Sequence, residues 1–190
     1  MSRLFIIGGC NGAGKTTASK TILPEILECE EFINADEIAY AILPTHPELV
    51  AMRAGRIMLE QIAEHINRGI DFAFETTLST RSYAPMLRDA KKRGYTIILI
   101  YIYLESEELA IQRVADRVAR GGHSIPSEVI RRRYKRGLAN FSRLFQIVAD
   151  SWVLYDNSST SPKLIARKGL GLDTDVFNAD IWSSIRSLCG

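Results

Sequence analysis

The chain has 190 residues, of which 46% are apolar and 24% are charged, and this suits one compact α/β domain with a full core. A net charge of +2 gives no reason to expect a nucleic-acid partner. No apolar run reaches the roughly 20 residues that a membrane-spanning helix needs. The three cysteines, Cys10, Cys29 and Cys189, lie far apart and predict free thiols rather than a zinc site or a disulfide framework. With no signal-peptide pattern at the N-terminus, they predict a cytoplasmic protein.

Short apolar runs alternate with helical patterns along the chain. The runs predict strands at residues 4–7, 31–34, 71–76, 95–104 and 152–155. The intervening patterns predict helices at residues 15–23, stopped near Pro24, at residues 48–67, and around Met86 and Ala90, capped by Gly94. A strand at residues 164–167 and a helix at residues 179–188 complete the tail. This alternation predicts a parallel sheet of five or six strands with helices on both faces.

Residues 9–16 read Gly-Cys-Asn-Gly-Ala-Gly-Lys-Thr and match the phosphate-binding pattern G-x-x-x-x-G-K-[ST] in full. The glycines let backbone N–H groups approach phosphate oxygens at the start of a helix, where the helix dipole also favours negative charge. Lys15 is expected on the β and γ phosphates and the Thr16 hydroxyl on Mg²⁺. The strand before the loop and the helix after it predict the three-layer α/β sandwich of P-loop NTPases. The residues predicted to bind ATP, or less favourably GTP, are Gly9, Cys10, Asn11, Gly12, Ala13, Gly14, Lys15, Thr16 and Thr17.

Polar side chains follow the second and third predicted strands, where the carboxyl ends of parallel strands face the ligand crevice. Asp36 is predicted to accept the proton of an acceptor hydroxyl or to hold a magnesium-bound water. It also fits the N-cap of the next helix, and the two interpretations are compatible. Glu75 and Thr77 combine a carboxylate with a hydroxyl, which suits a polyhydroxyl substrate. The alternative for this pair is a strand end that leads into a capped turn.

Arg113, Arg117 and Arg120 are spaced to share one helix face, with Ile111, Ala115 and Val118 as the predicted buried stripe. Gly121-Gly122 ends this helix, and a second helix that begins near Pro126 carries Arg133 and Arg136. Its predicted apolar stripe is Ile130, Tyr134, Leu138, Phe141 and Phe145.

Two helices that carry arginines and meet at a Gly-Gly hinge predict a lid at about residues 113–136 that closes over the nucleotide. Residues 113–136 hold eight Lys and Arg against two acidic residues, so the positive charge is local. A solvated helix face with pairs such as Asp116 and Arg120, or a nucleic-acid patch, are the alternatives. The aromatic residues fall on the apolar stripe, which argues against base stacking. His123, just after the hinge, is a further candidate for nucleotide contact.

Taken together, these motifs resemble the zeta toxin family of P-loop kinases. The resemblance extends from Leu4 to about Asn157. Its motifs are Asn-Ala-Asp at 34–36, Phe-Glu-Thr-Thr at 74–77, Arg-Val-Ala-Arg-Gly-Gly-His at 117–123 and Arg-Arg-Tyr at 132–134. The phosphate loop alone occurs in many families, whereas this ordered set is far more specific.

Characterised zeta toxins phosphorylate the 3′-hydroxyl of UDP-N-acetylglucosamine and are held by an antitoxin. The resemblance therefore implies a kinase with a sugar-nucleotide acceptor and a separate antitoxin partner. It implies Asp36 as the general base, with Lys15, Arg120 and Arg133 on the triphosphate. Glu75 and Thr77 would contact the sugar nucleotide.

The chain departs from the toxins after the Glu-Thr pair. Their arginine follows that pair closely, whereas here Ser79 and Thr80 precede Arg81, the candidate for a substrate contact. This departure leaves the acceptor open. The competing prediction is a nucleotide-dependent switch with slow hydrolysis, which would need a clear metal-binding Asp at the end of an apolar strand. The apolar strands instead end in Glu75, Glu105 and Asp156.

Overall fold

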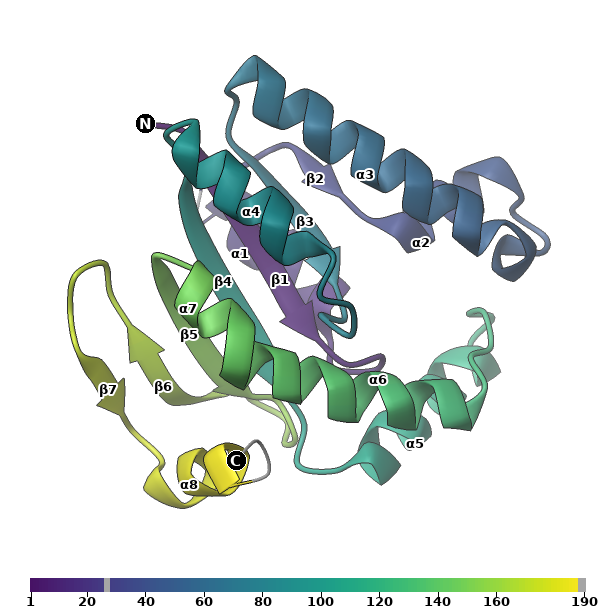
Figure 1. The fold of residues 1–190 in the computed structure, drawn as a ribbon. Helices are drawn as coiled ribbons and strands as arrows, with labels where there is room; N and C mark the ends of the chain where they lie inside the picture. The colour runs from purple at the N-terminus through teal and green to yellow at the C-terminus, as the bar shows by residue number, and fades with distance from the viewer. Residues whose placement is uncertain (26–27, 188–190) are drawn as a thin grey trace.

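The computed structural model describes residues 1–25 and 28–187 and places seven strands in one sheet (Figure 1). The strands are β1 (Arg3–Gly9), β2 (Phe32–Ile33), β3 (Phe72–Thr76), β4 (Thr96–Tyr103), β5 (Ser151–Asp156), β6 (Lys163–Lys168) and β7 (Thr174–Val176). Their order across the sheet is β2-β3-β1-β4-β5-β6-β7. Cys189 and the predicted helix end at Leu188 lie outside the described residues.

The sheet confirms the predicted α/β sandwich, but its far edge is not parallel. Strands β2, β3, β1, β4 and β5 are parallel, whereas β6 and β7 each run antiparallel to the preceding strand. Residues 157–162 between β5 and β6 are too few for the crossover helix that a parallel pair requires, so the chain turns back. The sequence prediction missed β7, whose three residues are all exposed.

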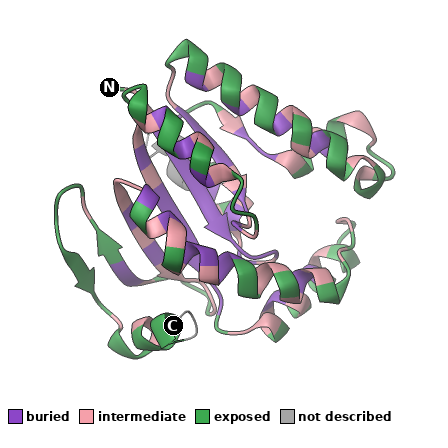
Figure 2. Cartoon of the chain, viewed as in Figure 1, coloured by how far each residue is buried: buried purple, intermediate pink, exposed green. Residues whose placement is uncertain are grey.

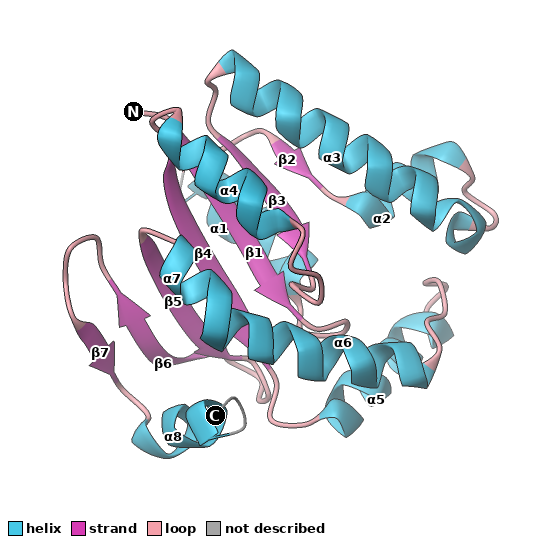
Figure 3. Cartoon of the chain, viewed as in Figure 1, coloured by secondary structure: helices cyan, strands magenta, loops and turns pink. Residues whose placement is uncertain are grey.

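Helices cover both faces of the sheet (Figure 3). They are α1 (Lys15–Glu25), α2 (Ala35–Ile42), η1 (Pro47–Val50), α3 (Ala51–Arg68), α4 (Tyr83–Lys92), α5 (Glu107–Ala119), α6 (Ser127–Asn140), η2 (Phe141–Phe145), α7 (Gln146–Val148) and α8 (Ala179–Ser187). One core cluster joins the sheet to α3, α4, α6 and α8, and a second lies against the loop before α1 and against α5. Across residues 1–25 and 28–187, no helix combines the length and apolar character needed to cross a membrane.

The central strands are buried on both sides (Figure 2). Leu4, Phe5, Ile6 and Ile7 of β1 are each at most 1% exposed, because neighbouring parallel strands and helices on both faces leave them no contact with solvent. The carboxyl ends of β1, β3 and β4 therefore emerge together from a rigid base.

The first predicted helix is confirmed, since α1 runs from Lys15 to Glu25 and so ends next to Pro24. The prediction for the buried face of α5 was wrong. In α5 the buried residues are Ala110 and Val114, whereas Val118 is exposed. The reason is that α5 packs on the phosphate loop: a Cβ placed on Gly12 would lie 2.8 Å from the Ala110 carbonyl oxygen.

Helix α6 crosses from the lid to the core. Ile130, near its start, belongs to the second core cluster, and Leu138, near its end, belongs to the first. The predicted apolar stripe of this helix is confirmed, with Phe141 and Phe145 continuing it in η2. A Cβ on Gly137 would lie 2.4 Å from the carbonyl oxygen of Thr77, so α6 passes directly over the end of β3.

Candidate active site

The phosphate loop joins β1 to α1 and lines one wall of a cavity of about 200 Å³. Asn11, Gly12, Gly14, Lys15, Thr16 and Thr17 line this cavity. The remaining predicted loop residues support the loop from beneath: Cys10 is 3% exposed, Ala13 is fully buried, and Gly9 packs against the carbonyl of Ile102. Burial raises the pKa of the Cys10 thiol to about 11, so this side chain stays neutral at physiological pH.

Asn157 holds the loop from the end of β5, and the sequence prediction missed this residue. Its side-chain amide donates to the carbonyl oxygen of Ala13 at 2.8 Å. Gly14 has a φ of +89°, and a Cβ there would lie 2.8 Å from the Asn157 amide nitrogen. The loop therefore needs glycine at this position for both conformation and space. Asn157 follows a predicted parallel strand, which is the signal by which it could have been found.

Glu75, at the end of β3, is the centre of a buried polar cluster. Its Oε2 accepts from the Thr16 hydroxyl at 2.8 Å and from the Asn34 amide at 3.1 Å. Its Oε1 lies 3.6 Å from the ammonium of Lys15. Lys15, which is 6% exposed, also donates to the Cys10 carbonyl at 2.9 Å. The register of β1 with β3 brings these groups together, since Gly8 pairs with Thr76 beside the start of the loop.

Asp36 lies in the first turn of α2 and projects into the site. The N-cap of α2 is Asn34, whose side chain accepts from the Asp36 backbone N–H at 2.8 Å, so the cap lies two residues before the predicted Asp36. This leaves the Asp36 carboxylate free of capping, and its side chain is 57% exposed. Its Oδ2 lies 3.9 Å from Nε2 of His123 in the lid.

Three lid arginines face the site, and one predicted arginine does not. Arg113 and Arg117 line the phosphate-loop cavity, and Arg133 donates to the Asn11 side chain at 3.2 Å. Arg120 follows the end of α5, is exposed and does not line the phosphate-loop cavity. It borders an open hollow with Gly121 and Gly122, and this hollow shares Arg113 and Arg117 with the phosphate-loop cavity.

Two further positive side chains of the lid pair with acidic residues of α5. Arg131 contacts Glu107 and Glu108 at 2.7 Å each, and Lys135 lies 3.3 Å from Glu107. These pairs join α6 to α5. Five of the eight positive side chains of residues 113–136 thus have one of two positions: three face the site, and two pair with acidic residues between the lid helices.

A second cavity, of about 180 Å³, adjoins the first on the β3 side. It shares Asn11, Lys15, Asp36 and Glu75 with the phosphate-loop cavity and adds Asn34, Ala35, Met58, Thr76, Thr77, Tyr83 and Arg133. Thr77, predicted from sequence, is therefore placed here. Arg81 is exposed and does not line this cavity, because its Nε donates to Asn140 of α6 at 3.1 Å.

The electrostatics of Arg133 suit an anion. Burial lowers the pKa of its guanidinium, and the neighbouring Asp36 carboxylate only partly opposes this shift. A half-buried cation with incomplete compensation gains from a bound negative group.

The residues near Thr16 fit magnesium held mainly by phosphates. No three His, Cys, Asp or Glu side chains gather as a metal site within the part of the chain that the structure describes. The Thr16 hydroxyl and the Glu75 carboxylate, already 2.8 Å apart, are two hard oxygen donors beside the phosphate cradle. Magnesium binds through few protein ligands plus substrate phosphates, so this small donor set is sufficient.

Comparison with known proteins identifies the family. A family model described as zeta toxin matches residues 3–164. The chain belongs to the zeta toxin family. A protein of uncharacterised function from Haemophilus influenzae is 32% identical over 126 residues, which cover 66% of this chain and 88% of that protein.

Solved structures share the fold at low sequence identity. The AvrRxo1-ORF1:ORF2 complex with ATP superposes with a TM-score of 0.80 at 15% identity, covering 99% of this chain and 64% of the matched chain. The present chain thus spans less than two thirds of the length of that AvrRxo1 chain. The PezAT toxin–antitoxin system of Streptococcus pneumoniae gives 0.68 at 15% identity, covering 100% and 84%. A gluconokinase from Sinorhizobium meliloti gives 0.51 at 17% identity, covering 83% of each chain. The fold is that of P-loop kinases.

Proposed function

We propose that this zeta toxin family member is an ATP-dependent kinase that phosphorylates a hydroxyl of a sugar nucleotide, with UDP-N-acetylglucosamine as the first candidate. The observation that carries the proposal is the position of Asp36. Its exposed carboxylate lies on the wall shared by the phosphate-loop cavity and the adjoining cavity. A general base must lie between donor and acceptor in this way. The 190 residues would act as one kinase domain with a lid at about residues 113–136.

The donor side is assigned to residues 9–17, with ATP preferred to GTP. The similarity to a structure determined with ATP supports this assignment. Arg113, Arg117 and Arg133 would compensate the triphosphate charge. The role predicted for Arg120 passes to Arg117, because Arg117 lines the phosphate-loop cavity and Arg120 does not.

Thr16 and Glu75 would hold magnesium, which supplies positive charge that neutralises the phosphates. In the chemical step the acceptor O–H bond breaks and its proton moves to the Asp36 carboxylate. The acceptor oxygen forms a bond to the γ-phosphorus as the bond to the β-phosphate oxygen breaks, and ADP leaves with that electron pair. Lys15 and Arg133 would stabilise the charge on the transferring group, which is the main protein contribution in phosphoryl transfer.

The acceptor would occupy the cavity that contains Asn34, Thr77 and Tyr83. Amide and hydroxyl groups of this kind suit the hydroxyls of a sugar, and Glu75 borders this cavity as well as the donor side. A separate antitoxin protein is a proposed partner, supported by the similarity to the PezAT and AvrRxo1 complexes. Nucleic acid is disfavoured as a partner, and a cytoplasmic location stays a prediction.

The experiment compares Asp36→Asn with Glu37→Gln, a neighbouring exposed carboxylate as matched control. Each protein is incubated with MgATP and a panel of sugar nucleotides, and ADP and phosphorylated products are quantified by mass spectrometry. Asp36→Asn should lower acceptor-dependent ADP formation by about 10²–10⁴-fold with ATP affinity preserved, and Glu37→Gln should behave as wild type. Wild-type turnover in Asp36→Asn would overturn the assignment of the base.

A nucleotide-dependent switch is the second candidate, and the Glu75–Thr16 hydrogen bond is the observation that favours it. In that contact a carboxylate at the end of a strand lies beside the Thr16 hydroxyl, which is the expected magnesium ligand. The carboxylate belongs to a Glu, whereas the switch prediction called for an Asp. ADP formation that no added acceptor stimulates would favour the switch over the kinase.

A further inference from the structure

The loop of residues 77–82 follows β3 and places Thr77 in the lining of the cavity of about 180 Å³ proposed for the acceptor. Its second residue, Leu78, has a φ of +53°, in the left-handed region that residues other than glycine rarely adopt. The Leu78 side chain is fully buried, and a Cβ placed on Gly8 of β1 would lie 2.9 Å from its Cδ1. A backbone conformation of this kind persists only where the surrounding structure holds it.

Asn140, the last residue of α6, supplies that hold. Its side-chain amide nitrogen donates to the Leu78 carbonyl oxygen at 2.8 Å, and its Oδ1 accepts from Nε of Arg81 at 3.1 Å. Asn140 is 5% exposed, so water does not readily replace these bonds. One turn earlier, Gly137 leaves the helix backbone close to the Thr77 carbonyl oxygen, where a Cβ would have no room. The last turn of α6 therefore fixes the loop at Thr77, Leu78 and Arg81.

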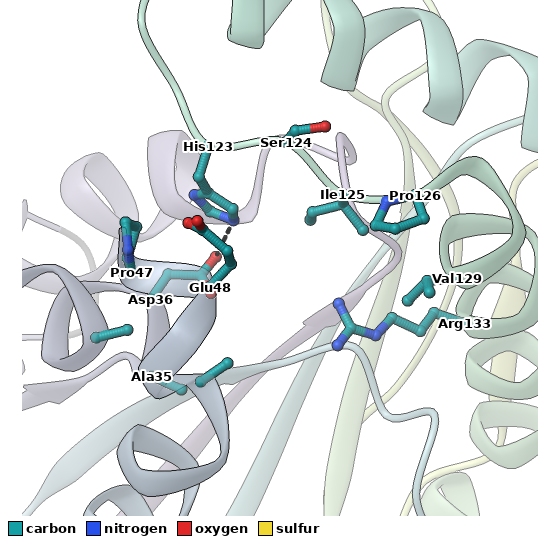
Figure 4. A pocket seen from close by; sticks show the side chains of 12 residues that line it. Ala35, Asp36, Pro47, Glu48, His123, Ser124, Ile125, Pro126, Val129 and Arg133 are labelled. Carbon is teal, nitrogen blue, oxygen red and sulfur yellow. Dashed lines mark ion pairs between the residues drawn. The ribbon is translucent and has the colours of Figure 1, made fainter. Parts of the chain in front are cut away.

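The same face of α6 reaches the donor side. Arg133, Gly137 and Asn140 are spaced at i, i+4 and i+7, which places them on one face of the helix. Arg133 donates to the side chain of Asn11 in the phosphate loop at 3.2 Å. Its guanidinium also borders a cavity of about 250 Å³, where it points across toward α2, the helix that carries Asp36 (Figure 4). One helix face thus contacts the phosphate loop at one end and the loop after β3 at the other.

Helix α6 keeps a fixed distance between these two loops. Seven residues separate Arg133 from Asn140, which corresponds to about 10 Å along a helix whose backbone hydrogen bonds resist stretching. Directly after Asn140 the chain forms the π-helical turn η2, where Phe141 stacks on Tyr101 of β4 with ring centroids 4.4 Å apart. This end of α6 is therefore packed on the sheet. A negative group bound at Arg133 would restrain the other end, and the restraint would reach the loop through Asn140.

We propose that Asn140 is a positioning residue for the acceptor: it holds the loop after β3 so that Thr77 faces the acceptor, and through α6 it makes this hold depend on the phosphates bound at Arg133. The inference rests on the proposed function, which places the donor at Arg133 and the acceptor at Thr77. ATP and acceptor should then bind with positive cooperativity, because whichever binds first orders the helix and loop for the other. Arg81, which does not line the acceptor cavity, would affect the acceptor only through Asn140.

The first test needs no acceptor. Amide hydrogen exchange of residues 77–82 is followed by mass spectrometry in the full chain, with and without magnesium and a non-hydrolysable ATP analogue. The analogue should slow exchange of this loop about tenfold in wild type. Asn140→Leu keeps a similar side-chain size and loses both hydrogen bonds. It should bind the analogue within about threefold of the wild-type affinity and show no slowing. Val148→Ala, at a buried apolar position in α7, controls for a general loss of stability and should retain the slowing. Equal slowing in wild type and Asn140→Leu, or none in wild type, would overturn the inference.

The second test uses an exposed position, so it holds even if Asn140→Leu does not fold. With UDP-N-acetylglucosamine as the probe, Arg81→Ala should raise the KM for the acceptor by about three- to tenfold and leave the KM for ATP unchanged. Arg88→Ala, an exposed arginine of α4, is the matched control and should change neither constant. An unchanged acceptor KM in Arg81→Ala, or equal changes in both KM values, would contradict the positioning role. If the loop slows as expected but the probe is not phosphorylated, the proposed acceptor fails and the role of Asn140 in fixing the loop stands.

Discussion

Replacing Glu75 with glutamine removes one negative charge from the buried cluster between β3 and the phosphate loop while nearly conserving the side-chain shape. The amide oxygen can still accept from Thr16 and Asn34, whose bonds to Oε2 measure 2.8 and 3.1 Å. The amide nitrogen would then face the Lys15 ammonium, which lies 3.6 Å from Oε1 in the native protein. The ion pair between Lys15 and Glu75 would thus be replaced by two hydrogen-bond donors that face each other.

The size of the effect follows from that distance. At 3.6 Å the gross attraction is roughly 4–5 kcal/mol for an effective dielectric constant of about 20. Removing one partner of a buried pair costs about 3–5 kcal/mol, but Lys15 retains the Cys10 carbonyl at 2.9 Å. We therefore expect the ligand-free protein to lose about 2–3 kcal/mol in free energy of unfolding, equivalent to a fall in Tm of about 5–10 °C at this chain length.

The assay is thermal unfolding at pH 7 under three conditions: EDTA alone, ATP with EDTA, and ATP with magnesium. Without metal, a phosphate of ATP takes the place of the lost carboxylate as the partner of Lys15. The phosphate is also no longer repelled by the negative charge of Glu75, so ATP should raise Tm more in Glu75→Gln than in wild type. With magnesium the order should reverse, because the variant lacks a metal ligand.

Glu105→Gln is the matched control, since Glu105 is an exposed carboxylate just beyond the end of β4. If Glu75→Gln lost no more stability than this control, the buried pair would not contribute as reasoned. If magnesium with ATP raised the Tm of wild type and of Glu75→Gln equally, the assignment of Glu75 as a metal ligand would be refuted.

Three further predictions test the lid, the packing and the loop. Arg117→Ala should lower kcat/KM by about 10²-fold or more and Arg120→Ala by less than about threefold in steady-state kinetics, and the reverse order would contradict the assignment of Arg117. Gly137→Ala should lower the free energy of unfolding in urea by about 2–4 kcal/mol, because its Cβ would lie 2.4 Å from a carbonyl oxygen, whereas Gly55→Ala should not destabilise. At pH 8, Cys10 should be alkylated about 100-fold more slowly than a free cysteine, since its pKa is raised from 9.0 to about 11, and its rate should increase with pH up to that value. Peptide-resolved mass spectrometry measures this rate, and alkylation at the rate of a free thiol would disprove it.

The sequence by itself determined the elements whose signals are local. The phosphate loop is a contiguous pattern, and the strand before it and the helix after it follow from hydrophobic period and length. The apolar stripe of α6 was predictable because large apolar residues at helical spacing lie on one face of the helix, and that face must pack against the core. Gly94 adopts a positive φ at a helix end, as its position after a helical pattern predicted.

Tertiary structure decided whatever depends on partners distant in the chain. The buried face of α5 could not be predicted, because it is set by contact with Gly12, about a hundred residues earlier in the chain. The same packing places Arg113 and Arg117 in the lining of the phosphate-loop cavity and leaves Arg120 outside that lining, although all three share one spacing pattern. The sequence predicted Glu75 as a substrate ligand, and the register of β1 with β3 adds a contact with Thr16 that the sequence could not predict. The antiparallel edge follows from the length of a loop, and the hollows around Asp36 exist only because lid, α2 and α3 approach one another without filling the space between them.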